Sequence, residues 1–178
     1  MNNPEGMQGF TLIELMVVIT VLGIVVAIGV PSFSTLIDNN RMSTMTNDLS
    51  STLQYARSEA VRRGSKVQVS AIGSNVQDGL QVWIDDNGNK AFDSGTDTQL
   101  RVLEVNPAVI TLAAQLNAGA LKNVAFSFNA RGESSLDETL TLELCDDRNG
   151  DYGRQLDLMT SGALRLRPDV ACNSGGAN

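Results

Sequence analysis

The sequence predicts an α+β protein in which one long N-terminal helix packs on a mostly antiparallel β-sheet head. Three observations lead to this prediction: an apolar run over residues 10–33, an amphipathic pattern over residues 34–64, and a change of period from about 3.6 to 2 after Gly64. The chain has 178 residues, of which 42% are hydrophobic. This length suits one folded head, which we place at residues 65–178, rather than two full domains.

The composition argues against several functional classes. The net charge of −7 does not suit a protein that coats nucleic acid with its whole surface, because phosphate binding needs clustered Lys and Arg, although a local basic patch remains allowed. The chain has no His, which removes the commonest general base and the commonest zinc ligand. We therefore expect no catalytic residues, no cofactor and no bound metal.

The apolar segment is long enough to cross a membrane. Between Phe10 and Val30 only two threonines and one glutamate are polar. Counted through Phe33, the run spans roughly 36 Å as a helix, and a bilayer core is about 30 Å thick. A secretory signal peptide would have a shorter apolar core followed by a polar mature chain, whereas here the polar leader comes first. Residues 10–33 therefore predict a transmembrane helix.

Glu14 is the unusual residue of this segment. An ionised carboxylate inside an apolar helix is costly unless it is paired, so its presence predicts a partner. If the chain is cut between Gly9 and Phe10, the new amine lies about one helical turn from Glu14. The amine of a neighbouring subunit is an equally suitable partner, and such a pair would fix the axial register of one helix against the next.

These residues carry a resemblance. Met-Gln-Gly9 followed by Phe10-Thr-Leu-Ile-Glu14-Leu, with Pro31 further along, resembles the prepilin signature of type IV pilins and of type II secretion pseudopilins. The resemblance implies that residues 1–9 are a leader removed by prepilin peptidase and that Phe10 becomes the N-methylated mature terminus. It also implies that Glu14 pairs with a neighbouring N-terminus during assembly, and that Pro31 is the proline near which pilin helices lose hydrogen bonds in filaments.

The leader departs from that pattern in its charge. It has no Lys or Arg and contains Glu5, so the positive-inside rule does not fix the orientation of the helix. An uncleaved anchor or a buried core helix is the structural alternative, and neither explains Gly9, Glu14 and Pro31 together.

Residues 34–64 predict an amphipathic helix that continues the chain toward the head. The helix is expected to end at about Arg63, because Gly64 suits a left-handed cap and Arg62 and Arg63 suit the negative end of the helix dipole. Steps of three and four separate the apolar residues that should pack on the sheet: Met42, Met45, Leu49, Leu53, Ala56 and Ala60.

The rest of the chain predicts short strands separated by turns rich in Gly, Asn and Asp. The expected strands are Lys66–Ile72, Leu80–Ile84, Leu100–Val105, Val109–Leu112, Val124–Phe128, Leu140–Leu144, Gln155–Met159 and Ala163–Arg167.

Short segments of the helix and head also resemble the FimT/GspH family of minor pilins and pseudopilins. They are Leu53-Gln-Tyr-Ala-Arg-Ser-Glu-Ala60, Gly79-Leu-Gln-Val-Trp-Ile-Asp-Asp, Leu144-Cys-Asp, Gly153-Arg154 and Met159-Thr-Ser-Gly162. The resemblance covers nearly the whole chain. It implies the pilin fold and a structural role, with other minor and major pilins or pseudopilins as partners.

Two acidic turns raise the question of calcium. In Asp85-Asp-Asn-Gly-Asn-Lys-Ala-Phe-Asp93, oxygen ligands alternate as in a calcium loop, but the sixth position is Lys90 and the twelfth is Thr96, where an EF-hand has Gly and Glu. The acidic stretch Asp146–Asp151 is similar. An Asx-rich connection between strands explains the same residues, and acids in polar turns without an aromatic platform do not indicate glycoside cleavage.

A basic strand near the C-terminus is the candidate binding site. In Ser161-Gly-Ala-Leu-Arg165-Leu-Arg167, the two arginines should project from one face while Leu164 and Leu166 face the core. Some FimT-type pilins bind DNA here through a Gly-Arg-x-Arg motif and serve DNA uptake in natural transformation. Arg165 matches that motif, whereas Ala163 replaces its first arginine. Arg154 and Arg131 are candidates to extend the patch, and the alternative is an exposed face that keeps the head soluble.

Cys145 and Cys172 are the two cysteines of the chain. An even count in a head outside the cytoplasm favours a disulfide, and two unpaired thiols are the alternative.

The expected function is that of a minor type IV pilin in pilus assembly or at the pilus tip, with binding of double-stranded DNA as an added role. The alternative is a minor pseudopilin of type II secretion. Either protein would cross the bacterial inner membrane once, hold its head in the periplasm, and then enter a pilus or pseudopilus.

Overall fold

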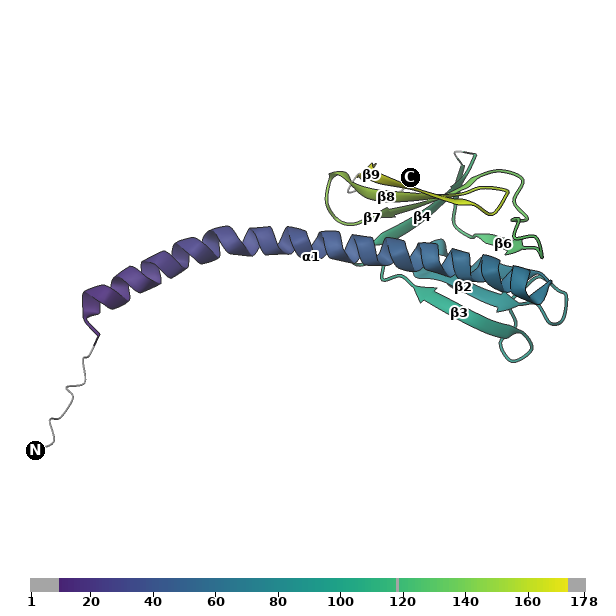
Figure 1. The fold of residues 1–178 in the computed structure, drawn as a ribbon, viewed down its shortest axis with the longest axis horizontal. Helices are drawn as coiled ribbons and strands as arrows, with labels where there is room; N and C mark the ends of the chain where they lie inside the picture. The colour runs from purple at the N-terminus through teal and green to yellow at the C-terminus, as the bar shows by residue number, and fades with distance from the viewer. Residues whose placement is uncertain (1–9, 118, 173–178) are drawn as a thin grey trace, which may run out of the picture. The chain divides into compact units, whose positions relative to one another are not determined.

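The computed structural model describes residues 10–117 and 119–172, and it confirms the α+β class with one long helix followed by antiparallel sheets (Figure 1). The chain divides into two compact units that meet between Asn39 and Asn40, within the helix α1 (Leu12–Arg63). The strands are β1 (Val67–Ala71), β2 (Gly79–Ile84), β3 (Thr98–Glu104), β4 (Thr111–Leu116), β5 (Gly119–Leu121), β6 (Ala125–Phe128), β7 (Leu140–Cys145), β8 (Gly150–Leu158) and β9 (Leu164–Cys172).

The first unit contains the apolar part of α1. Its large side chains from Leu12 to Ile28 are exposed, and the helix is long and apolar enough to cross a membrane. Thr20 is compatible with an apolar setting because its hydroxyl donates a 2.7 Å hydrogen bond to the carbonyl oxygen of Met16. α1 extends through position 31. The predicted segments 10–33 and 34–64 therefore belong to one continuous helix.

The second half of α1 supplies the core of the head. Met42, Leu49 and Leu53 are buried, as are the two alanines of the predicted stripe, and Met45 packs against them. The helix ends at Arg63 as predicted. Gly64 has φ +64°, its N–H donates to Val61, and the next N–H donates to Ala60. This is the Schellman arrangement, in which a left-handed residue satisfies the last helical carbonyls.

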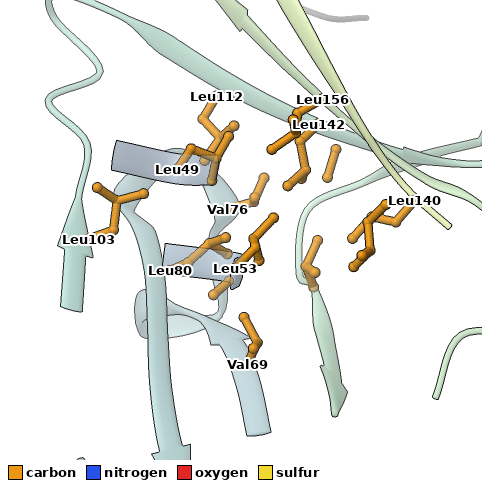
Figure 2. Close-up of a cluster of buried hydrophobic side chains, with 14 of the residues drawn as sticks. Leu49, Leu53, Val69, Val76, Leu80, Leu103, Leu112, Leu140, Leu142 and Leu156 are labelled. Atoms are coloured by element: carbon orange, nitrogen blue, oxygen red, sulfur yellow. The ribbon is translucent and has the colours of Figure 1, made fainter. Parts of the chain in front are cut away.

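The head has two sheets. One has the strand order β3-β2-β1-β6, the other has the order β5-β4-β7-β8-β9, and every paired strand is antiparallel to its neighbour. Figure 2 shows Leu49 and Leu53 of α1 between the two sheets, with the labelled side chains of both sheets turned toward them. The helix is therefore the middle layer of one shared core: Val69, Leu80 and Leu103 come from the first sheet, and Leu112, Leu140, Leu142 and Leu156 from the second.

The strand predictions need several corrections. The sequence missed β5, and β4 begins at Thr111 rather than Val109 because the N–H groups of Val109 and Ile110 donate to Asn106 in a turn. Strands β8 and β9 are longer than expected. Leu166 was predicted to face the core, but it is 50% exposed. It lies opposite Leu156, on the core side of the sheet but on its outermost strand, β9.

An ion cluster near the end of α1 predicts how head stability depends on pH. Glu59 is buried and accepts hydrogen bonds from Arg62 and Arg63, and these bonds lower the pKa of its carboxyl from 4.5 to about 2. A lowered pKa means that the stabilisation is complete above the ordinary value and is lost as the pH falls from 4.5 toward 2.

We therefore expect the full chain in detergent to lose stability on acidification more steeply than a Glu59→Gln variant. The measurement is urea unfolding followed by the fluorescence of Trp83, the only tryptophan. Glu133→Gln is the control. The exposed Arg131 lowers the pKa of Glu133 as well, but an exposed ion pair contributes little to stability. Parallel curves for the wild type and Glu59→Gln would contradict the assignment.

Candidate functional site

The candidate processing site begins the described part of the chain. Gly9 lies outside the described residues, and Phe10 is 82% exposed. Thr11 caps α1, because its hydroxyl oxygen accepts a 3.3 Å hydrogen bond from the N–H of Glu14. Glu14 lies in the first turn, where the helix dipole favours a negative charge. Its side chain is exposed on an otherwise apolar helix surface, which keeps it available for a partner.

The two arginines of the candidate binding strand lie on one face, as expected. In the β8–β9 ladder Arg165 lies opposite Asp157, and Arg167 lies opposite Gln155. Residues opposite one another in an antiparallel ladder project to the same side. This face, defined by Gln155, Asp157, Arg165 and Arg167, is called the arginine face below.

The arginine face is not equally positive along its length. Arg167 forms a 2.9 Å ion pair with Asp157, whose side chain is 3% exposed. Asp157 also accepts hydrogen bonds from the Thr141 hydroxyl at 3.1 Å and the Gln155 amide at 2.7 Å. Within residues 10–117 and 119–172, Arg165 has no ion pair and is exposed. Arg165 is therefore the cation of this face that is open to a ligand.

The other two candidate arginines lie elsewhere. Arg154 lies in register with Leu144 and Pro168, one position from Gln155, so it projects from the opposite face of the sheet. Its guanidinium is 3.3 Å from the carboxylate of Asp169. Arg131 lies in the turn after β6 and pairs with Glu133. The structure thus brings Arg165 and Arg167 together and places Arg154 on another surface.

A junction of two turns holds the start of β9, and sequence reasoning missed it. Arg57 of α1 donates from Nε to the carbonyl oxygen of Gly132 at 2.8 Å and from Nη2 to that of Ser161 at 3.2 Å. The N–H of Ser134 donates to the Thr160 carbonyl at 2.9 Å. These bonds tie the turn after β6, the β8–β9 turn and the helix together. We call this arrangement the turn junction.

The first acidic turn, residues 85–97, satisfies its carboxylates with backbone amides. Asp85 accepts from the N–H groups of Gly88 and Lys90, and Asp97 accepts from those of Asp86 and Asp93. In the parts of the chain that the structure describes, no group of three or more His, Cys, Asp or Glu side chains is placed to hold a metal ion. The hydrogen bonds support the Asx-rich connection.

In the second acidic turn Asp146 accepts a hydrogen bond from the backbone N–H of Arg148 and also forms an ion pair with the Arg148 side chain. Arg148 donates to Asp146 at 2.8 Å and lies over the ring of Tyr152, 4.2 Å from its centroid. An arginine held between a carboxylate and an aromatic ring stabilises a loop through its own positive charge.

The predicted disulfide is confirmed. Cys145 and Cys172 are joined, with their Cα atoms 5.8 Å apart, and the bond links the end of β7 to the end of β9 across β8. Gly153 of β8 leaves room for it: a Cβ atom there would lie 2.7 Å from the Cys172 sulfur and 3.3 Å from the Cys145 sulfur. The same Cβ atom would lie 2.8 Å from the backbone oxygen of Val170, so a side chain at position 153 would displace both the disulfide and the neighbouring strand β9.

Comparisons with known proteins agree with this fold. Residues 45–163 match the family model described as type II transport protein GspH, and residues 6–30 match the prokaryotic N-terminal methylation motif. A pilin-like protein, PilA1 of Thermus thermophilus, is 29% identical over 164 residues, covering 89% of this chain and 97% of the relative. A fimbrial protein of Pseudomonas aeruginosa is 24% identical over 132 residues, covering 72% and 82%.

Solved structures lead to the same group. The crystal structure of the type IV minor pilin FimU of Pseudomonas aeruginosa is 25% identical, with a TM-score of 0.57, and the match covers 73% of this chain and 90% of that one. A second crystal form of FimU matches with a TM-score of 0.53 over 71% and 93%.

Proposed function

Since the chain belongs to the GspH family of type IV pilin-like proteins, we propose that it is a minor pilin that takes part in pilus assembly or forms part of the pilus tip. The observation that carries the proposal is the combination of an N-terminal methylation motif with a head that resembles the minor pilin FimU. Members of this family are structural subunits that assemble with other pilins. We therefore expect this protein to function through contacts with other subunits rather than through catalysis.

The proposed assembly mechanism begins with the apolar part of α1. The chain is inserted in the inner membrane through residues 10–33, with the head in the periplasm, and prepilin peptidase cuts it between Gly9 and Phe10. The exposed Glu14 then pairs with the methylated amine of a neighbouring subunit, because an ionised carboxylate on an apolar helix needs an opposite charge. Pro31 is the place where the helix loses hydrogen bonds in the filament.

The proposed cleavage between Gly9 and Phe10 can be tested directly. We expect the mature protein, purified from its host membranes, to lack residues 1–9 and to begin with N-methylated Phe10. Mass spectrometry of the N-terminal peptide measures both changes. The control is production of the protein in a host whose prepilin peptidase is inactive. In that host the leader should remain attached. A mature chain that still contains Gly9 would contradict the mechanism.

The second candidate function is a minor pseudopilin of type II secretion, which the description of the matching family model favours. Deletion of the gene separates the two candidates. Loss of twitching or of natural transformation supports the pilus, whereas accumulation of exoenzymes in the periplasm with intact pili supports secretion.

We further propose that the arginine face binds double-stranded DNA during uptake. Arg165 supports this proposal, because it is exposed on a face whose other arginine is already paired. One or two phosphate contacts give weak and salt-sensitive binding, which several copies in a filament would strengthen.

The corresponding prediction concerns Arg165→Gln. We expect the full chain in nonionic detergent to bind a short DNA duplex more weakly after this change, with the slope of log K against log salt reduced by about one. Fluorescence anisotropy measures both quantities. Lys90→Gln removes one exposed positive charge from the loop between β2 and β3 and is the matched control. Unchanged binding in an Arg165→Gln, Arg167→Gln double variant would rule out DNA binding at this face.

A further inference from the structure

Resting on the proposed DNA binding, we propose that Asp157 determines the anion affinity of the arginine face, and that it does so by holding Arg167 in an ion pair. Asp157 is thus a positioning residue that acts through Arg167 and contacts no ligand itself. The ligand class is a phosphate polyanion, and the part of the face that contacts phosphate is Arg165.

The surroundings of Asp157 carry the first step of the argument. Its carboxylate is 3% exposed, and it accepts from Thr141 of β7, from Gln155 of its own strand and from Arg167 of β9. Three donors from three strands hold this charge in one position. A phosphate that drew Arg167 away would leave a buried carboxylate without its counter-charge, which is among the most unfavourable changes in a protein. Arg167 therefore stays with Asp157 when an anion approaches.

The net charge of the arginine face follows from this arrangement. Arg165, Arg167 and Asp157 together have a net charge of +1. Glu143 of β7 lies opposite Gln155 and therefore adds a negative charge on the same side of the sheet. Asp157 lies directly opposite Arg165 in the ladder. If Arg167 were removed, the carboxylate of Asp157 would be left without its counter-charge beside Arg165, and the face would lose one unit of positive charge. Arg167 thus supports binding by occupying Asp157, without a phosphate contact of its own.

These different roles of Arg165 and Arg167 predict a pattern of binding affinities among variants that a direct phosphate contact by Arg167 would not produce. Asp157→Asn keeps the shape of the side chain and releases Arg167 as a second free cation. We expect about threefold to tenfold tighter binding at low salt, with the salt slope steeper by about one. Arg167→Gln should weaken binding to the level of Arg165→Gln. In the Asp157→Asn, Arg167→Gln double variant the net charge of the face equals that of the wild type, and binding should return to the wild-type value.

The experiment is a salt titration of fluorescence anisotropy, with the full chain in nonionic detergent and two probes, a short DNA duplex and linear polyphosphate. Asp137→Asn is the matched control, since it removes the same charge from an exposed loop position between β6 and β7. Trp83 fluorescence checks that each variant is folded. If Asp157→Asn does not fold, Asp157→Ser takes its place, because it makes the same charge change and keeps an acceptor for Thr141.

The outcomes separate this inference from the proposed function. If the wild type binds the duplex but Asp157→Asn binds no more tightly, or if the double variant stays as weak as Arg167→Gln, the role of Asp157 is wrong and DNA binding stands. If no variant binds the duplex, DNA binding is wrong, and the polyphosphate titration decides the role of Asp157. Tighter polyphosphate binding by Asp157→Asn than by the wild type supports the role of Asp157. Equal binding by the two proteins, or no binding by either, overturns it.

Discussion

A Gly162→Ala variant is expected to lose about 3 kcal/mol or more of unfolding free energy, the large-effect end of single substitutions. Gly162 has φ +76°, which costs a residue with a Cβ atom about 1 kcal/mol. The larger part comes from space, because the Cβ atom would lie 1.9 Å from the carbonyl oxygen of Gly132 and 3.0 Å from Nε of Arg57. The oxygen is backbone, so the turn junction must open and the hydrogen bonds of Arg57 must break.

The measurement is urea unfolding of the full chain in detergent, followed by Trp83 fluorescence. Gly88→Ala is the matched control. Gly88 has φ +79°, and a Cβ atom there would meet nothing within 4 Å. This variant should therefore show only the conformational cost of about 1 kcal/mol. Equal losses in the two variants would mean that the turn junction does not contribute to stability.

Removing the disulfide is expected to have an effect of similar size. The bond joins residues 27 positions apart, and closing a loop of this length stabilises the folded state by about 3 to 4 kcal/mol in the chain-entropy treatment. The Cys145→Ala, Cys172→Ala double variant should unfold at a correspondingly lower urea concentration. Reductant should lower the stability of the wild type toward that of the variant.

A Gly153→Ala variant is the control for the double variant, because it retains both sulfur atoms. Gly153→Ala keeps both cysteines but places a Cβ atom 2.7 Å from the Cys172 sulfur and 2.8 Å from the backbone oxygen of Val170. The contact with the oxygen acts in both redox states, whereas reduced thiols can move away from the Cβ atom, so the loss of stability should be larger in the oxidised protein. Mass spectrometry of the wild type without reductant should show no alkylatable thiol. Two alkylatable thiols in freshly purified protein would contradict the disulfide.

Much of the fold was predictable because its signals are local. The end of α1 at Arg63 follows from a glycine and the arginines before it, all within one turn. The helix stripe predicted the buried face correctly, since a period near 3.6 decides which residues face the core. Strand β5 was missed because its three residues, Gly119 to Leu121, have no alternation of their own and are ordered by pairing with β4.

The candidate site was predictable only in part, because it depends on contacts between distant segments. Alternation correctly placed Arg165 and Arg167 on one face, but it gave no information about Asp157, whose position opposite Arg165 depends on the ladder register. Arg57 is separated from its acceptors by 75 and 104 positions. Leu166 shows the related limit: alternation gives the side of a strand, whereas burial depends on how far the covering layer extends.

The strand β9 is fastened at both ends. Its far end is linked by the disulfide to β7, and the turn before it is tied by Arg57 to α1. An outermost strand that is free at one end can be peeled from its neighbour one hydrogen bond at a time, at low force. With both ends held, tension on the arginine face must shear many hydrogen bonds of the β8–β9 ladder at once.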